Sequence, residues 1–263
     1  MKKYSIFHIP VFSFFSTALY RDVCRNWRGT CLLYLFLLLT LCWIPYVVKL
    51  HLGLSNFVLN EAPKVVSQLP KMTVNKGELT VDATQPYNIA DPVTGKILVI
   101  IDTTGKTAGL EGDDVVCLVK KNEVIIRKSK YERRSFDLKP VDHFYLDKDR
   151  VTRWLEIFRK YFAICLFPLA LGMSFTFRIF QMLIYACIGL LFASMCNSKI
   201  SYLPLLRLSV VAVTPCIIIR TVFDLSGIHI PFAGLLSLIM TMVYLYIGVK
   251  ASAAVEEYPK GNL

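Results

Sequence analysis

The stretch Thr30–Val48 reads TCLLYLFLLLTLCWIPYVV and carries no charged residue. Because a helix needs about 20 apolar residues to cross the hydrocarbon core of a bilayer, this stretch predicts a transmembrane helix. A basic region precedes it, as in a signal peptide, but the apolar run is long and shows no small-residue cleavage site. We therefore predict an uncleaved membrane anchor at residues 30–48.

Three further apolar blocks follow in the last third of the chain. Tyr161–Ser198 is interrupted by Arg178 and Gln181. It would be about 57 Å long as one helix, which is too long for a single crossing, so we expect a tight turn near Arg178. The sequence predicts about five transmembrane helices: the anchor, then Phe158–Phe177, Ile179–Cys196, Pro204–Leu225 and Ile230–Val249.

Composition and charge support a chain in contact with lipid. The sequence is 55% hydrophobic and 19% charged, with a formal net charge of +11, whereas soluble domains have about 45–50% apolar and about 25% charged residues. The basic excess flanks the apolar runs, as in membrane proteins, rather than lying in the polar middle of the chain. We therefore expect the lipid bilayer as a partner and no nucleic acid.

The fold class that follows is an α-helical integral membrane protein with one small β-rich extracytoplasmic domain. The expected segments are a cytoplasmic interfacial lead-in at 1–29, the anchor at 30–48, a β-rich polar domain at 49–156, a four-helix membrane domain at 157–250 and a tail at 251–263. The basic N-terminus favours the cytoplasmic side for the lead-in. A cytoplasmic polar domain is the competing topology, because Lys199 and Arg207 would otherwise face outward.

The lead-in has aromatic residues followed by arginines. Phe7, Phe12, Phe14 and Phe15 come before Arg21, Arg25 and Arg28. This order favours a segment that lies in the headgroup region with its apolar side in the membrane. A disordered basic tail is the alternative.

The polar domain shows strand patterns. Met72–Val74 and Glu78–Val81 flank Asn75-Lys76-Gly77, and Val115–Val119 and Glu123–Arg127 flank Lys120-Lys121-Asn122; both arrangements predict hairpins. Lys96–Asp102 (KILVIID) predicts a buried strand. Leu146–Arg159 is expected to be a helix that leads into the second span.

No pattern in the polar domain predicts a catalytic, metal-binding or cofactor site. Asp102 ends the KILVIID strand and precedes Thr-Thr-Gly, which suggests either an Asx turn or a phosphotransferase-like nucleophile, with the turn favoured. The nearby acids Glu111, Asp113 and Asp114 lack the glycine-centred spacing of a calcium loop and are expected to be solvated. We therefore expect no cofactor.

The third membrane block carries the remaining candidate residues. Arg207 and Arg220 lie near its two ends, where their side chains can extend to the interfaces. Thr214-Pro215 lies at its middle, where proline removes a backbone hydrogen bond and is expected to kink the helix. Arg220 and Asp224 are four residues apart, which allows an ion pair or a polar path for a solute.

A series of short motifs occurs in order along nearly the whole chain: Phe14-Phe15-Ser16, Leu19-Tyr20-Arg21-Asp22, Gly29, Tyr34-Leu35, Gly77-Glu78-Leu79, Gln85-Pro86-Tyr87-Asn88-Ile89, Ile101-Asp102-Thr103-Thr104-Gly105-Lys106, Tyr202, Leu206-Arg207, Ala212-Val213-Thr214-Pro215, Pro231 and Tyr244-Leu245-Tyr246. Together these motifs resemble a bacterial membrane-protein family of unknown function, one member of which is connected with maltodextrin utilisation. The resemblance implies a location in the bacterial cytoplasmic membrane, and a membrane part distantly similar to Yip-type trafficking proteins, which act as scaffolds without an established catalytic site.

Three functions are compatible with these features. The leading hypothesis is a non-enzymatic scaffold or accessory factor for other membrane proteins, with a possible link to sugar uptake implied by the resemblance. The second is a small transporter or transporter subunit that uses Arg207, Arg220 and Asp224. The third, a membrane enzyme that uses Asp102, is the weakest. No small-molecule ligand is identified.

Overall fold

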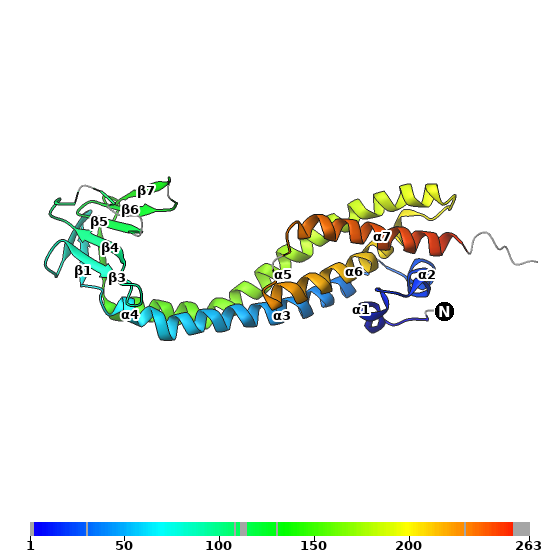
Figure 1. Cartoon of the computed structure of the whole chain (residues 1–263), viewed down its shortest axis with the longest axis horizontal. Coiled ribbons are helices and arrows are strands. Elements are labelled where there is room, and N and C mark those ends of the chain that lie inside the picture. Colours follow the sequence, from blue (N-terminus) through cyan, green and yellow to red (C-terminus); the bar gives the residue numbers. More distant parts are fainter. Residues whose placement is uncertain are drawn as a thin grey trace, which may run out of the picture. The chain divides into compact units, whose positions relative to one another are not determined.

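The computed structural model of the chain describes residues 3–29, 31–107, 109–110, 115–129, 131–228 and 230–254. The chain forms two compact units (Figure 1). Met1–Leu50 and Ala163–Leu263 form what we call the membrane unit, and His51–Phe162 form the β unit. The expected tail at 251–263 lies outside the described residues from Val255 onward.

Four helices in the described part of the chain are long and apolar enough to cross a membrane. The first consists of α3 (Leu32–Asn56), which continues through a π-helical turn at Phe57–Glu61 into α4 (Ala62–Val66). The others are α5 (Lys148–Met195), α6 (Tyr202–Ser226) and α7 (Ala233–Ala253). The membrane character therefore agrees with the apolar runs in the sequence, although it rests on length and composition.

The prediction of about five spans is wrong, because α5 continues through Arg178 without a turn. The segment Phe177–Gln181 contains neither glycine nor proline, so nothing in it breaks a helix. The Arg178 side chain donates a hydrogen bond to Gln181 three residues later on the same helix. Arg178 and Gln181 thus lie within a continuous helix, where a loop was expected.

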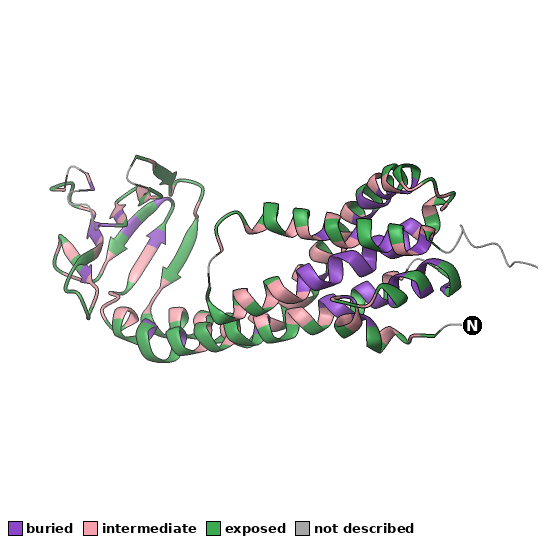
Figure 2. Cartoon of the chain, turned by 45° about the vertical axis from the view of Figure 1, so that its right-hand side comes forward, coloured by how far each residue is buried: buried purple, intermediate pink, exposed green. Residues whose placement is uncertain are grey.

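The core of the membrane unit is α6. Every residue from Leu205 to Ile217 is buried, and Figure 2 shows this as the longest purple stretch of helix. Helices α1, α2 and α7 contact α6. From α3, the Tyr34 hydroxyl lies 3.2 Å from the Thr214 hydroxyl, and at Gly189 of α5 an added Cβ would come within 3.3 Å of Leu205. The buried stretch of α6 is thus enclosed by its neighbours.

The lead-in is folded, so the alternative of a disordered basic tail is wrong for the residues that the structure describes. It forms a 3-10 turn (Ile6–His8), α1 (Ile9–Phe12) and α2 (Thr17–Asn26). Leu19, Tyr20 and Val23 of α2 are almost completely buried in the same core as α6 and α7. Phe7 and Phe15 remain exposed on its other side.

Asp22 organises this lead-in. Its buried carboxylate accepts hydrogen bonds from the backbone N–H groups of Lys3 and Tyr4, from Asn26 Nδ2 at 2.7 Å and from Trp27 Nε1 at 3.0 Å. Burial by itself raises the pKa of Asp22, but these hydrogen bonds outweigh it and hold the pKa below its usual value. An ionised carboxylate therefore ties the start of the chain to the end of α2.

The β unit contains two sheets. The first has the order β2-β1-β8, and the second has the order β3-β4-β5-β6-β7. All neighbouring strands are antiparallel except β4 and β5, which are parallel. The strands are β1 (Met72–Asn75), β2 (Glu78–Val81), β3 (Tyr87–Ala90), β4 (Ile97–Asp102), β5 (Cys117–Lys120), β6 (Glu123–Arg127), β7 (Arg133–Asp137) and β8 (His143–Leu146).

Both predicted hairpins and the KILVIID strand are confirmed. The β1–β2 turn places Lys76 at φ 49° and Gly77 at φ 81°, as a tight hairpin turn requires. Ile101 of β4 is fully buried and packs with Val74, Leu79 and Ile89. The helix expected from Leu146 begins at Lys148 as α5.

Replacing Gly248 with alanine is expected to destabilise the contact between α2 and α7. A Cβ there would lie 2.7 Å from Cδ1 of Tyr20, and overpacking of this kind costs about 1–3 kcal/mol, against a gain of about 1 kcal/mol in helix propensity. Amide hydrogen exchange of α2 in the purified full-length protein should become faster. The matched control is Gly234→Ala on the same helix, where an added Cβ meets nothing within 4 Å; equal exchange in both variants would contradict the packing argument.

Candidate functional site

A cavity of 380 Å³ lies between α3, α5 and α6 within the membrane unit. Ionisable side chains from two membrane helices line it: Arg178 from α5, and Arg220 with Asp224 from α6. The other lining residues are Leu39, Cys42, Trp43, Tyr46, Ser174, Phe177, Ile217 and Thr221. Ionisable groups within membrane helices face cavities or partners, which makes this cavity the candidate site.

The predicted ion pair between Arg220 and Asp224 is confirmed. Arg220 Nε lies 3.7 Å from Asp224 Oδ2, one helical turn further along α6. Both side chains are about half exposed, at 54% and 53%, so the pair adds little stability by itself. Both groups are therefore accessible to a ligand at the wall of the cavity.

Arg178 belongs to this site, although the sequence pattern suggested a turn at its position. It is half-buried, and its guanidinium donates to Oε1 of Gln181. Nε2 of Gln181 in turn donates to the Tyr185 hydroxyl at 2.6 Å. A charged residue in the middle of an apolar run was the signal that could have identified it as a site residue.

A second cavity, of 340 Å³, lies on the other side of the same ion pair, between α6 and α7. Arg220 and Asp224 line it as well. Its remaining walls are mostly apolar: Cys216, Ile219, Phe223, Ile228, Ile230, Ala233, Leu236, Ser237 and Met240. The ion pair thus lines two cavities, one that also contains Arg178 and one whose other walls are mostly apolar.

The structure does not bring Arg207, Thr214 and Pro215 into either cavity. Thr214 donates to the carbonyl of Val210 at 3.0 Å and lies beside Tyr34, so it joins α6 to α3. Pro215 is buried within the continuous helix α6. Arg207 is buried near the opposite end of α6 and donates to the carbonyl of Leu203 at 3.3 Å, one turn towards the helix start.

Asp102 is a turn former at the end of β4. One carboxylate oxygen accepts hydrogen bonds from the backbone N–H of Thr104 at 2.9 Å and from its hydroxyl at 2.6 Å; the other accepts from the N–H of Thr107 at 2.6 Å. The hydrogen bond from the Thr104 hydroxyl lowers the pKa of Asp102. Burial raises this pKa and the hydrogen bonds from Thr107 lower it further, so that the pKa lies well below its usual value. Both oxygens of Asp102 accept hydrogen bonds and the side chain is buried, so this carboxylate is not exposed for attack on a substrate.

The acids Glu111, Asp113 and Asp114, which were expected to be solvated, lie outside the described residues. Among the described residues, no group of three His, Cys, Asp or Glu side chains is placed to hold a metal ion.

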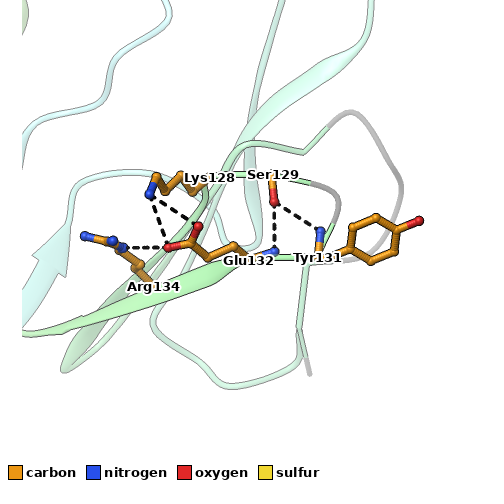
Figure 3. A network of polar contacts seen from close by, with 5 residues as sticks. All are labelled: Lys128, Ser129, Tyr131, Glu132 and Arg134. Carbon is orange, nitrogen blue, oxygen red and sulfur yellow. Dashed lines mark hydrogen bonds and ion pairs between the residues drawn. The ribbon is translucent and has the colours of Figure 1, made fainter.

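The β6–β7 hairpin presents a polar network on the surface of the β unit (Figure 3). The Glu132 carboxylate pairs with Lys128 Nζ and with Arg134 Nε, the latter at 3.1 Å. The Ser129 hydroxyl oxygen accepts the backbone N–H groups of Tyr131 and Glu132. The Glu132 carboxylate is shared between two basic side chains, and all three side chains are exposed, so the network shapes the turn between β6 and β7.

Substitution of Asp102 by asparagine is expected to destabilise the β unit by about 1–3 kcal/mol, because an amide N–H would face the donors that the carboxylate now accepts. Since the folded-state pKa of Asp102 lies below its unfolded value of about 3.9, this stabilisation is present above about pH 4 and is lost as the pH falls further. Amide protection factors of β4 and β5 in the full-length protein should show both effects.

The matched control for this experiment is Asp91→Asn. Asp91 forms the same type of turn, with Val93 and Thr94, but is more exposed, so its replacement should have a much smaller effect. If Asp102→Asn leaves the protection of β4 unchanged at pH 7, Asp102 is not needed to form the turn.

The chain resembles known proteins over most of its length. The family described as a protein of unknown function (DUF1189) matches residues 7–249. An uncharacterised protein of Rickettsia prowazekii (strain Madrid E) is 25% identical over 158 residues, which are 55% of this chain and 54% of that protein. The chain thus spans about half the length of this curated relative. No solved structure matches.

These matches carry no link to maltodextrin or to Yip-type proteins, so both stay predictions from the resemblance. The matched region includes the β unit and both cavities. The chain therefore belongs to the DUF1189 family of proteins of unknown function.

Proposed function

We propose that the protein is a non-enzymatic integral membrane protein that acts as a scaffold or accessory factor for other membrane components. The observation that carries this proposal is the exposed apolar surface of α5. Large apolar side chains are exposed along this helix from Tyr161, at 49%, to Met195, at 73%. That distance is about 51 Å at about 1.5 Å per residue.

A bilayer alone does not cover this length. Its hydrocarbon core is about 30 Å thick, so burying the whole stretch would need a tilt of about 54°, beyond the range of about 0–40° seen for membrane helices. Part of the apolar surface of α5 therefore lies outside the hydrocarbon. Exposed apolar surface of this extent is typical of a contact with another protein.

The β unit is proposed to lie outside the cytoplasm and to contribute a second contact surface. The basic lead-in supports this orientation by the distribution of Lys and Arg. Strand β7 ends the five-stranded sheet, and all five of its residues are exposed. A location in the bacterial cytoplasmic membrane, Yip-like scaffolding and a link to sugar uptake rest on the resemblance.

A photo-crosslinking amino acid placed on α5 tests the accessory role. We expect a protein adduct in living cells from Ile164 or from Met195, which are both exposed on α5 and lie about 47 Å apart along the helix, because a core of about 30 Å does not cover both even at a tilt of about 40°. The control position is Leu235 on α7, which is exposed within a helix of ordinary membrane length. Absence of a protein adduct at both α5 positions, together with a stable monomer after mild solubilisation, would contradict the proposal.

Labelling of Tyr131→Cys tests the orientation. Tyr131 is 92% exposed on the β unit, so its replacement should preserve the fold. A thiol reagent that does not cross membranes should label this cysteine in intact cells, whereas Phe7→Cys in the lead-in should react after permeabilisation. The reverse order would place the β unit in the cytoplasm, as in the competing topology.

Transport of a small solute is the second candidate function. The cavity that contains Arg178, Arg220 and Asp224 favours it, because such groups line polar paths in membranes. Against it, the sequence shows no internal repeat of the kind on which many alternating-access transporters are built. Flux through the purified protein in liposomes is the direct measure of this function.

A further inference from the structure

The Arg220–Asp224 ion pair separates two cavities that differ in character. The cavity between α3, α5 and α6 contains a second guanidinium, that of Arg178, and the hydroxyls of Ser174 and Thr221. The cavity between α6 and α7 is walled largely by aliphatic and aromatic side chains, including Ile219, Phe223 and Leu236. A charged compartment beside an apolar one matches a molecule with a charged head and a hydrocarbon chain.

The charge of the first cavity selects an anion. Two guanidinium groups face one carboxylate, so the ionisable side chains of the cavity carry a net charge of +1. Asp224 pairs with Arg220, and within the described residues Arg178 makes no ion pair with a carboxylate; its described contact is the neutral amide of Gln181. Guanidinium groups bind phosphate and carboxylate groups through two parallel hydrogen bonds, and their preference for such anions increases where water is scarce.

The aromatic residues of the cavity are typical of the headgroup region. Trp43 and Tyr46 line the same cavity as Arg220, and their rings pack edge to face with their centroids 5.3 Å apart. Such residues concentrate where the hydrocarbon meets the lipid headgroups. Close by, Lys49 Nζ donates to the carbonyl of Leu225 at 2.7 Å, near the end of α6. A lipid in the surrounding leaflet would therefore present its headgroup at the level of Arg178 and Arg220.

We propose that the membrane unit binds an anionic amphiphile, with its phosphate or carboxylate group on Arg178 and Arg220 and its hydrocarbon chain in the cavity between α6 and α7. Asp224 weakens binding by holding Arg220, so the pair must loosen when the anion binds. This site goes beyond the accessory role, because the ligand is a lipid-like molecule rather than a protein partner.

Quenching of Trp43 fluorescence by brominated lipids tests the site. The full-length protein is placed in nanodiscs of phosphatidylcholine that contain a minor fraction of brominated phosphatidylglycerol or, in a parallel arm, of brominated phosphatidylcholine. The signal of Trp43 is the difference between the protein and its Trp43→Phe variant, which removes the contributions of Trp27 and Trp154. We expect stronger quenching by the anionic lipid at an equal mole fraction.

The arginine and aspartate variants are expected to change the affinity for phosphatidylglycerol in opposite directions. Arg178→Gln and Arg220→Gln should each weaken the apparent affinity for phosphatidylglycerol about tenfold, as expected for the loss of a charge-assisted hydrogen bond. Asp224→Asn frees Arg220 and should increase the apparent affinity for phosphatidylglycerol by about two- to fivefold. A misfolded variant would not show such an increase. The control is Lys49→Gln, which also removes one positive charge. Lys49 does not line the cavity, so the preference for phosphatidylglycerol over phosphatidylcholine should persist.

Three outcomes would overturn the proposal. Equal quenching by the two brominated lipids would show that the site has no preference for an anion. An equal loss in Lys49→Gln and Arg178→Gln would indicate general surface charge instead of a site. Reversal of the quenching by millimolar inorganic phosphate would assign the cavity to a free anion rather than to an amphiphile.

Discussion

The enclosure of α6 is the constraint on which the membrane unit depends. Hydrocarbon offers no hydrogen-bond partners, so each spanning segment satisfies its backbone internally as a helix, and association then depends on close packing. From Leu205 to Ile217, α6 meets this requirement by contact with the lead-in and with α3, α5 and α7. The polar groups of Ser209 and Thr214 donate to carbonyls of their own helix, which removes the cost of burying them.

The close contact between α2 and α7 shows how precise this packing is. At Gly248 the helix backbone comes so near to Tyr20 that a methyl group does not fit without movement. The Tyr20 hydroxyl donates to the carbonyl of Ser13 at 2.7 Å, and Asp22 binds the first described residues of the chain. The lead-in is thus a structural component of the membrane unit, with its exposed aromatic side chains free for lipid.

The length of α5 connects the fold with the proposed function. A helix of 48 residues is about 72 Å long, more than twice the thickness of a hydrocarbon core. Its exposed apolar side chains extend from Tyr161 to Met195, over about 51 Å, and Arg178 lies within this apolar stretch. In the proposed functions, this surface of α5 binds a partner protein, and Arg178 together with Arg220 of α6 binds an anionic group.

The sequence by itself determined the local structure. The apolar runs predict the membrane helices, and KILVIID predicts the buried strand β4. Asn75-Lys76-Gly77 between two strand patterns predicts the β1–β2 turn, in which Lys76 and Gly77 adopt positive φ. The Asx turn at Asp102 and the ion pair between Arg220 and Asp224 could also be predicted, because each involves residues at most five positions apart. Such contacts depend on local spacing, which the sequence displays directly.

The tertiary structure alone decided the rest. The sequence suggested a turn at Arg178, whereas the structure shows a continuous helix with Arg178 at a cavity formed by three helices. The burial of Asp22 and Tyr20, and the two cavities around the ion pair, depend on residues up to about 230 positions apart, as the contact between Tyr20 and Gly248 shows. The physical reason is that apolar periodicity shows that a helix is buried but does not specify its neighbours, since shape and close approach select those only in the packed molecule.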